Sequence, residues 1–237
     1  MRKLRFRPHL GMTLAALAGV IATLALSHWQ WQKAQQKFAL AARFEQLAKE
    51  PPVRIGEQPV DAEQLRFRNV EAQGRWVADK MILLDNKIRH GIAGYEVVMP
   101  LAIGKGAMHV LINRGWIAGT GDRRQLPQVK TPTDPVTISG IAVTPPAHFL
   151  ELSGDVVEGK VWQNLVLERY RKASGLAIQP VVIEQQSASD DGLAREWPAP
   201  DTGAARNQGY AFQWLSFAVM IAVLYVALNC KREAQPD

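Results

Sequence analysis

Two long apolar runs lie near the ends of the chain, and shorter alternating stretches lie between them. The first run covers residues 10–27 and the second residues 210–229, and neither contains a charged residue. At 1.5 Å per residue, helices of these lengths would be about 27 and 30 Å long, close to the thickness of a bilayer's hydrocarbon core. We predict transmembrane helices at residues 10–28 and 208–229.

The first helix is expected to extend beyond the membrane. Apolar residues recur at helical spacing after residue 28, at Ala34, Phe38 and Ala48. Pro51 and Pro52 then end the pattern, because proline lacks the amide hydrogen that a helix interior requires.

Strand signals dominate the segment between the two runs. "MILLDNK" and "YEVVMPL" flank the connection "IRHGIAG", which predicts a hairpin. Further strands are expected at "HVLINRGWI", "VTISGIAV", "KVWQNL" and "PVVIE". A short helix is predicted at residues 165–174, capped by Gly175, and the polar residues 184–208 read as a linker. We therefore expect an α+β membrane protein in which two transmembrane helices flank a β-rich domain at residues 29–207, either a sandwich or a barrel-like fold.

The charge distribution orients these segments. The formal net charge is +6, and most of this excess lies in two short tails. Its basic residues are Arg2, Lys3, Arg5, Arg7, Lys231 and Arg232. By the positive-inside rule, tails 1–9 and 230–237 are cytoplasmic and the central domain is extracytoplasmic, in the periplasm of a bacterial inner-membrane protein. The near-neutral middle of the chain offers no basic face for nucleic acid.

A cleaved signal peptide is the alternative reading of the first run. Residues Ala25, Leu26 and Ser27 form an acceptable cleavage site after a basic start. The length of the run, and the lack of a helix breaker after it, favour an uncleaved anchor.

The central domain shows no arrangement of residues typical of an enzyme. The chain's one cysteine, Cys230, lies at its cytoplasmic end, so no disulfide or thiolate metal site is expected in the domain. The histidines His90, His109 and His148 lack partners at ligand or general-base spacing, and there is no nucleophile elbow. The neighbouring Asp190 and Asp191 in the linker are expected to be solvated.

Two polar pairs at strand ends suggest a structural role. Asp85 and Arg114 follow apolar runs and would suit an ion pair between neighbouring strands. Asn86 and Asn113 beside them would satisfy turn backbone groups.

The second apolar run begins with hydrogen-bonding and aromatic side chains. Tyr210, Gln213, Trp214 and Phe217 fall on one helical face. An unsatisfied amide in hydrocarbon costs several kcal/mol, so this face either contacts another helix or a cofactor edge, or anchors the helix at the interface.

An ordered set of motifs resembles the surfeit locus protein one family of cytochrome c oxidase assembly factors. The motifs are "HWQWQKAQQK", "QGRW", "LLDNK", "GYEVVMPL", "LINRGW", "WQNL" and "GYAFQWLSFA". Residues at matching motif positions are Trp29, Gln30, Asp85, Asn86, Gly94, Tyr95, Pro100, Asn113, Arg114, Gly115 and Trp116. The resemblance implies a non-enzymatic role in delivering haem a to oxidase subunit I, with other assembly factors and haem a synthase as expected partners.

The resemblance also implies a haem site at the outer end of the second run. Parts of the family have a histidine three residues before Tyr210, where this chain has Asn207. His28 ends the first run at the same membrane face and would serve as a substitute axial ligand, with Tyr210, Gln213 and Trp214 against the macrocycle. The alternatives are an interfacial His28 and, for the whole protein, a cofactor-free membrane scaffold that docks an envelope protein.

Overall fold

The computed structural model describes residues 4–120, 125–145, 157–198 and 202–232. Its chain divides into two compact units. Residues 1–43 with 199–237 form the first, here called the helix pair, and Phe44–Pro198 forms the second, called the barrel unit.

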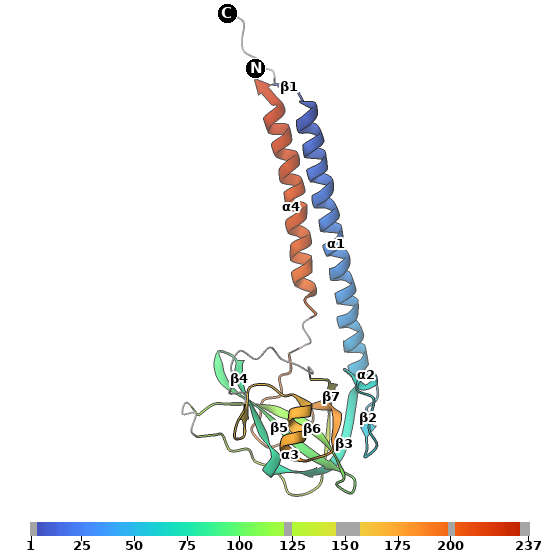
Figure 1. Cartoon of the computed structure of the whole chain (residues 1–237), viewed down its shortest axis with the longest axis vertical. Helices are drawn as coiled ribbons and strands as arrows, with labels where there is room; N and C mark the ends of the chain where they lie inside the picture. Colours follow the sequence, from blue (N-terminus) through green and yellow to red (C-terminus); the bar gives the residue numbers. More distant parts are fainter. Residues whose placement is uncertain (1–3, 121–124, 146–156, 199–201, 233–237) are drawn as a thin grey trace, which may run out of the picture. The chain divides into compact units, whose positions relative to one another are not determined.

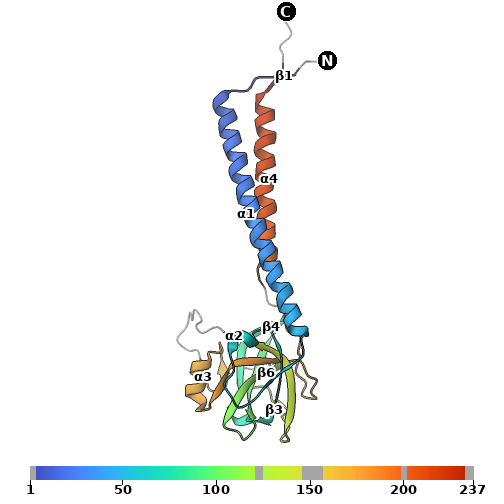
Figure 2. The ribbon, with the colours of Figure 1, turned by 90° about the vertical axis from the view of Figure 1, so that its right-hand side faces the viewer.

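The helix pair consists of two antiparallel helices that run side by side in both views (Figure 1, Figure 2). They are α1 (Leu10–Lys49) and α4 (Ala204–Asn229). Short strands β1 (Leu4–Phe6) and β11 (Cys230–Arg232) pair antiparallel next to the helix ends. The uninterrupted α1 confirms that the first helix continues to the residues before Pro51 and Pro52.

Small residues line the contact between the two helices. Ala204, Ala211 and Ala218 recur every seventh residue of α4 and are buried, which lets the backbones approach closely. The Ser27 hydroxyl donates to the carbonyl of Ala211 at 2.8 Å, and the Thr13 and Tyr225 hydroxyls lie 2.7 Å apart.

Large apolar side chains cover the outside of the pair. Exposed examples are Leu14, Leu17, Ile21, Val219, Val223 and Leu228. Among the described residues, α1 and α4 are the helices long and apolar enough to cross a membrane.

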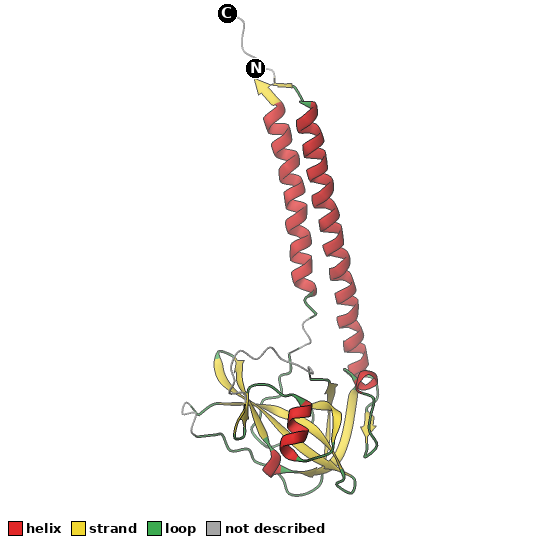
Figure 3. Cartoon of the chain, viewed as in Figure 1, coloured by secondary structure: helices red, strands yellow, loops and turns green. Residues whose placement is uncertain are grey.

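Strands make up most of the barrel unit (Figure 3), and five of them pair into a closed ring. They are β3 (Asn69–Trp76), β5 (Ile92–Ile103), β6 (Met108–Ala118), β7 (Val136–Val143) and β10 (Ile178–Gln185). The order is β3-β7-β10-β6-β5, and β5 returns to β3 with Trp76 opposite Leu101. All neighbours are antiparallel except β10 and β6. This ring resolves the expected sandwich or barrel as a barrel.

Four further strands extend the sheet beyond the ring. They are β2 (Val53–Ile55), β4 (Ile82–Arg89), β8 (Val157–Glu158) and β9 (Val161–Trp162). The predicted β4–β5 hairpin is confirmed, but the prediction that seven residues connect its strands is wrong. Only His90 and Gly91 separate the strands, with φ of 50° and 76°, as a tight two-residue turn of the primed kind requires.

Short helices complete the barrel unit. They are α2 (Ala62–Leu65), the 3₁₀ helix η1 (Ala78–Lys80) and α3 (Leu167–Ser174). The predicted helix and its glycine cap are confirmed, since Gly175 has φ of 73° and its amide donates to the carbonyl of Arg171. Tyr170 of α3 packs with Trp162, Val98 and Val182 in a cluster over the outside of the ring.

Candidate functional site

The end of the helix pair at which α4 begins carries a polar contact centred on Asn207. Its Nδ2 donates to Oε1 of Gln30 at 2.6 Å, and its Oδ1 accepts from Nζ of Lys37 at 2.7 Å. Both atoms of the amide are therefore engaged in joining α4 to α1. Asn207 and Gln30 are among the residues predicted from the sequence. Lys37 is not, although its position two turns after Gln30 places it on the same face of α1.

His28 lies outside this contact. Its side chain is exposed, and its Nε2 lies 2.9 Å from Nε2 of Gln32, one turn along the same helix. Asn207 instead meets Gln30 and Lys37. The structure thus does not bring His28 and Asn207 together.

The predicted cofactor contacts lie on opposite flanks of the helix pair. Trp31 of α1 contacts Phe212 of α4, with ring centroids 6.1 Å apart. His28 is about 60° around the helix from Trp31, so it shares the Phe212 flank. Tyr210 is about 200° from Phe212 around α4 and lies on the other flank. One haem cannot take its ligand from His28 and rest on Tyr210 within a single helix pair.

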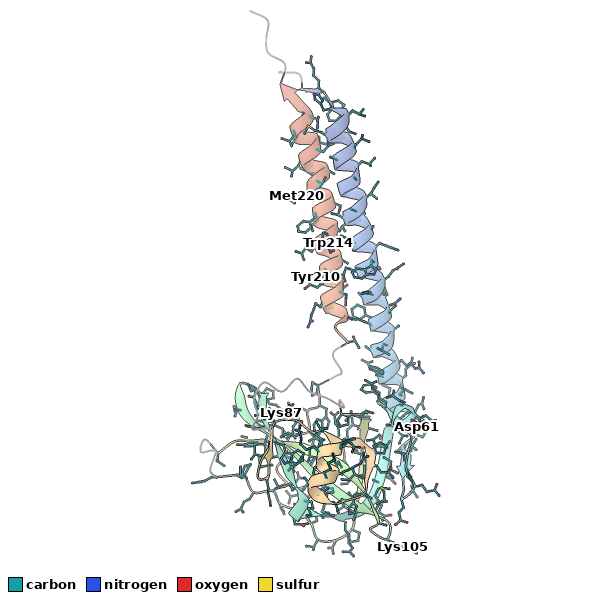
Figure 4. All side chains as sticks on the ribbon, viewed as in Figure 1. Asp61, Lys87, Lys105, Tyr210, Trp214 and Met220 are labelled. Carbon is teal, nitrogen blue, oxygen red and sulfur yellow. The ribbon has the colours of Figure 1, made fainter. Side chains whose placement is uncertain are left out.

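The Tyr210 flank is an exposed polar and aromatic stripe. Tyr210 is 47% exposed, Gln213 is exposed, and Trp214 packs edge-on against Phe217 with ring centroids 5.6 Å apart. Figure 4 shows Tyr210, Trp214 and Met220 successively along α4. On the other helix, Trp29 is covered by Nζ of Lys33, 3.9 Å from the ring centre. The stripe offers hydrogen bonds and stacking to a neighbouring helix.

In the barrel unit, Arg114 pairs with Asp191, and the predicted Asp85–Arg114 ion pair is wrong. The Arg114 side chain is fully buried, and its guanidinium lies 2.9 Å from Oδ2 of Asp191. It also donates to the hydroxyl of Thr131 at 2.8 Å. Asp85 instead accepts from the backbone amide of Asn86 at 2.7 Å. The pairing fails because Arg114 points to the side of β6 that residues 190–195 cover.

Asp191 is buried, contrary to the expected solvated pair. Its Oδ2 also accepts from Arg195 at 2.5 Å, and its Oδ1 accepts from the amide of Leu193 at 3.2 Å. Burial alone would raise the pKa of Asp191, but these hydrogen bonds outweigh it and hold the pKa below its usual value. Asp190 alone behaves as predicted, exposed and paired with Lys130 at 2.6 Å.

The segment expected to be a linker is largely part of the barrel unit. Residues 184 and 185 belong to β10. Ala194 and Trp116 exchange backbone hydrogen bonds of 2.8 and 2.9 Å, and the Trp197 indole donates to the carbonyl of Gln185 at 2.8 Å. The polar, small-residue composition hid these contacts, because nothing in it marks Asp191 as a buried counter-ion.

Glycines in the two central motifs allow close backbone packing. A Cβ on Gly94 would lie 2.3 Å from the carbonyl oxygen of Ile117. Gly115 has φ of 140°, and its Cβ would lie 2.7 Å from the carbonyl oxygen of Ala194. Of the other motif residues, Tyr95 lies in the core, and the carbonyl of Pro100 accepts from the amide of Val77 at 3.0 Å.

A charged cluster lies beside the β4–β5 hairpin. Asn113 donates to Glu96 at 3.1 Å, and Lys87 lies 3.3 Å from the same carboxylate. Burial raises the pKa of the nearby Glu184 to about 7, and the charge of Glu96 adds to the rise while Arg89 and Lys87 oppose it. No sequence motif predicted this cluster.

An open pocket of about 460 Å³ adjoins the cluster. It is lined by Asn86, Lys87, Ile88, Arg89, His90, Glu96, Glu196, Trp197 and Pro198. Arg89 lies 3.7 Å from Glu96, donates to the carbonyl of Glu196 and covers the ring of Trp197.

The histidines do not form a metal site in the described part of the chain, where no group of three metal-ligating residues is found. His90 is in the hairpin turn, 3.0 Å from Glu196, and the buried His109 packs against the carbonyl of Ala177. His148 lies outside the described residues.

These features define a small closed barrel flanked by two helices of membrane-spanning length. The chain belongs to the SURF1 family, whose match covers residues 17–219 and includes parts of both helices. The family is known broadly for oxidase assembly.

Two relatives show how far the similarity extends. A SURF1-like protein of Monosiga brevicollis is 21% identical over 236 residues, covering 93% of this chain and 88% of that protein. A SURF1-like protein of Dictyostelium discoideum is 29% identical over 119 residues, and this match covers 46% of the chain and 43% of the relative.

Proposed function

We propose that this protein is a non-enzymatic assembly factor for a haem-copper cytochrome c oxidase, assisting the delivery or insertion of haem a into subunit I. The observation that carries the proposal is the family match, which runs from α1 through the barrel unit into α4. The expected location is a bacterial inner membrane, with both tails cytoplasmic and the barrel unit periplasmic.

The Tyr210 flank is the proposed contact with subunit I. A membrane helix that exposes Gln213 opposite its packed face gains by meeting another polar helix. Other assembly factors and haem a synthase are proposed as further partners, reached through the same membrane or through the barrel unit.

His28 is the proposed iron ligand for any haem a held by the protein. Its flank provides exposed aromatic surface, since Trp31 is 40% and Phe212 54% exposed. Imidazole is a suitable axial ligand, whereas the amide of Asn207 is a poor one and is already engaged on both sides. The bound haem would supply the metal centre that subunit I receives.

The test compares cells lacking the gene with cells carrying the parent or His28→Ala. We expect loss of the gene to lower the haem a content of subunit I, measured by optical spectra of isolated oxidase. Normal haem a content without the gene would contradict the assembly role. A spectrum of the purified protein, co-expressed with the haem a synthesis enzymes, should show haem in the parent and not in His28→Ala.

A cofactor-free scaffold is the second candidate. The split of His28 and Tyr210 between two flanks favours it. It predicts that the purified parent protein carries no haem, while loss of the gene still impairs oxidase assembly.

A further inference from the structure

The tip of the β4–β5 hairpin exposes apolar side chains in an otherwise well-packed unit. Among the described residues of 44–198, the exposed large hydrophobic side chains are Ile88, 65% exposed, and Ile92, 54% exposed. Both flank the two-residue turn at His90 and Gly91. Ile92 pairs with Arg89 and Ile88 pairs with Ala93, so the two isoleucines lie on opposite faces of the hairpin. Single exposed isoleucines are ordinary, but two beside one turn make both faces of the tip apolar.

The charge of the tip suits a lipid surface. From Lys87 to Gly94 the chain contains two basic residues, one histidine and no acidic residue. Glu96 at the hairpin base pairs with Lys87 and Arg89, and the exposed Glu196 pairs with His90. The apolar side chains therefore provide the main attraction, with the cations beside them compatible with anionic headgroups.

The hairpin also lies next to the point where the chain leaves the barrel unit. Arg89 and His90 contact Glu196, and Arg89 covers Trp197. Only five residues separate Pro198 from Ala204, where α4 begins. Six residue steps span at most about 22 Å, so Pro198, two residues after the Glu196 that the hairpin contacts, lies within that distance of the first residue of α4.

We propose that the β4–β5 hairpin tip, through Ile88 and Ile92, docks into the interfacial layer of the bilayer that holds α1 and α4. This contact is a third attachment of the barrel unit, in addition to its two covalent links to the helices. It does not depend on haem binding or on oxidase assembly.

The test uses the full-length chain reconstituted in vesicles of phosphatidylcholine and phosphatidylglycerol. An environment-sensitive fluorophore is attached at Ile92→Cys in a Cys230→Ser background, and separately at Ile88→Cys. The matched control is Lys105→Cys in the β5–β6 turn, which is exposed; Figure 4 shows Lys87 and Lys105 well apart on the barrel unit. Vesicle flotation first verifies membrane insertion of each variant.

We expect blue-shifted emission at both hairpin positions, and quenching by bromine on the lipid acyl chains, with neither effect at the control. Emission and quenching at both hairpin positions equal to those of the control would overturn the proposal. A blue shift without bromine quenching, growing with the protein-to-lipid ratio, would also overturn it and assign the tip to a second copy of the chain.

Discussion

At the scale of single residues, Arg114 shows most clearly that the effect of a buried charge on stability depends on its partner. The two terminal nitrogens of this fully buried guanidinium donate to Asp191, to Thr131 and to the carbonyl of Lys130. Removing one partner of a buried pair leaves the charge of the other uncompensated. We expect Asp191→Ala to lower the free energy of unfolding of the barrel unit by about 3–5 kcal/mol. Urea unfolding in detergent, followed by tryptophan fluorescence, measures this.

The neighbouring Asp190 provides the control. Its side chain is exposed and its pair with Lys130 lies in solvent, so Asp190→Ala should leave the free energy of unfolding nearly unchanged. Equal effects of the two substitutions would contradict the buried-pair account.

Glu184 makes the barrel unit sensitive to pH. Its pKa of about 7 in the folded protein lies above its ordinary value of 4.5, so folding favours the protonated carboxyl. The parent therefore loses stability as the pH rises from 4.5 to 7. At pH 8 we expect Glu184→Gln to be more stable than the parent by roughly 3 kcal/mol, and at pH 4 nearly equal.

Unfolding curves at several pH values test this directly. Glu168→Gln, on the surface of α3 and 2.6 Å from Arg171, is the control and should follow the parent at neutral and alkaline pH. A Glu184→Gln variant with the same loss of stability between pH 4.5 and 7 as the parent would show that Glu184 is not the titrating group.

At the scale of elements, the seam between α1 and α4 depends on small side chains. Ala211 is 3% exposed and contacts the Ser27 hydroxyl through its carbonyl. Ala211→Leu should overpack this seam and destabilise the helix pair by about 1–3 kcal/mol, measured by thermal loss of helical circular dichroism in detergent. Val219→Leu replaces a side chain that is 57% exposed and should leave the stability nearly unchanged. An equal loss of stability in this variant would contradict the claim that tight packing between α1 and α4 stabilises the pair.

The elements differ in how far the sequence predicted them. The long helices, the β4–β5 hairpin and the Gly175 cap follow from local patterns, and all three are present. Strand β3 was not predicted because its inward residues Val70 and Ala72 give way to Gln73 and Gly74, which weakens the alternation. Ring closure depends on β3 meeting β5 and on parallel pairing of β10 with β6, and such long-range pairing leaves no local signal.

In the candidate site, too, contacts between residues far apart in the sequence were not predicted. Helical spacing correctly grouped Tyr210, Gln213 and Trp214, because they lie on one helix. It could not separate their flank from that of His28, since this depends on how α1 and α4 rotate against each other. Arg114 follows an apolar run, and this predicted an ion-pair partner, but the separation of 77 residues between Arg114 and Asp191 concealed which residue the partner is.

At the scale of the whole molecule, the proposed function requires the Tyr210 flank of the helix pair as well as a folded barrel unit. We expect Tyr210→Ala, Gln213→Ala and Trp214→Ala together to lower the haem a content of subunit I substantially, because they remove the proposed docking stripe without touching the α1 contact at Ala211. Spectra of isolated oxidase from complemented cells measure the effect.

The control replaces exposed apolar residues of the same helix. Val219→Ala and Val223→Ala, on side chains 57% and 60% exposed, leave the polar stripe intact and should retain most activity. If the stripe variant supports normal oxidase assembly at equal protein levels, docking through this flank is excluded.

The contacts of residues 191–197 also determine how the protein bears mechanical load. A pull on α4 reaches the barrel unit through this segment, where the Trp197 indole, the two Ala194–Trp116 hydrogen bonds and the buried Asp191 lie in series along the chain. These contacts must break one after another before the tension reaches β10. The segment therefore protects the closed ring from tension that is applied through α4.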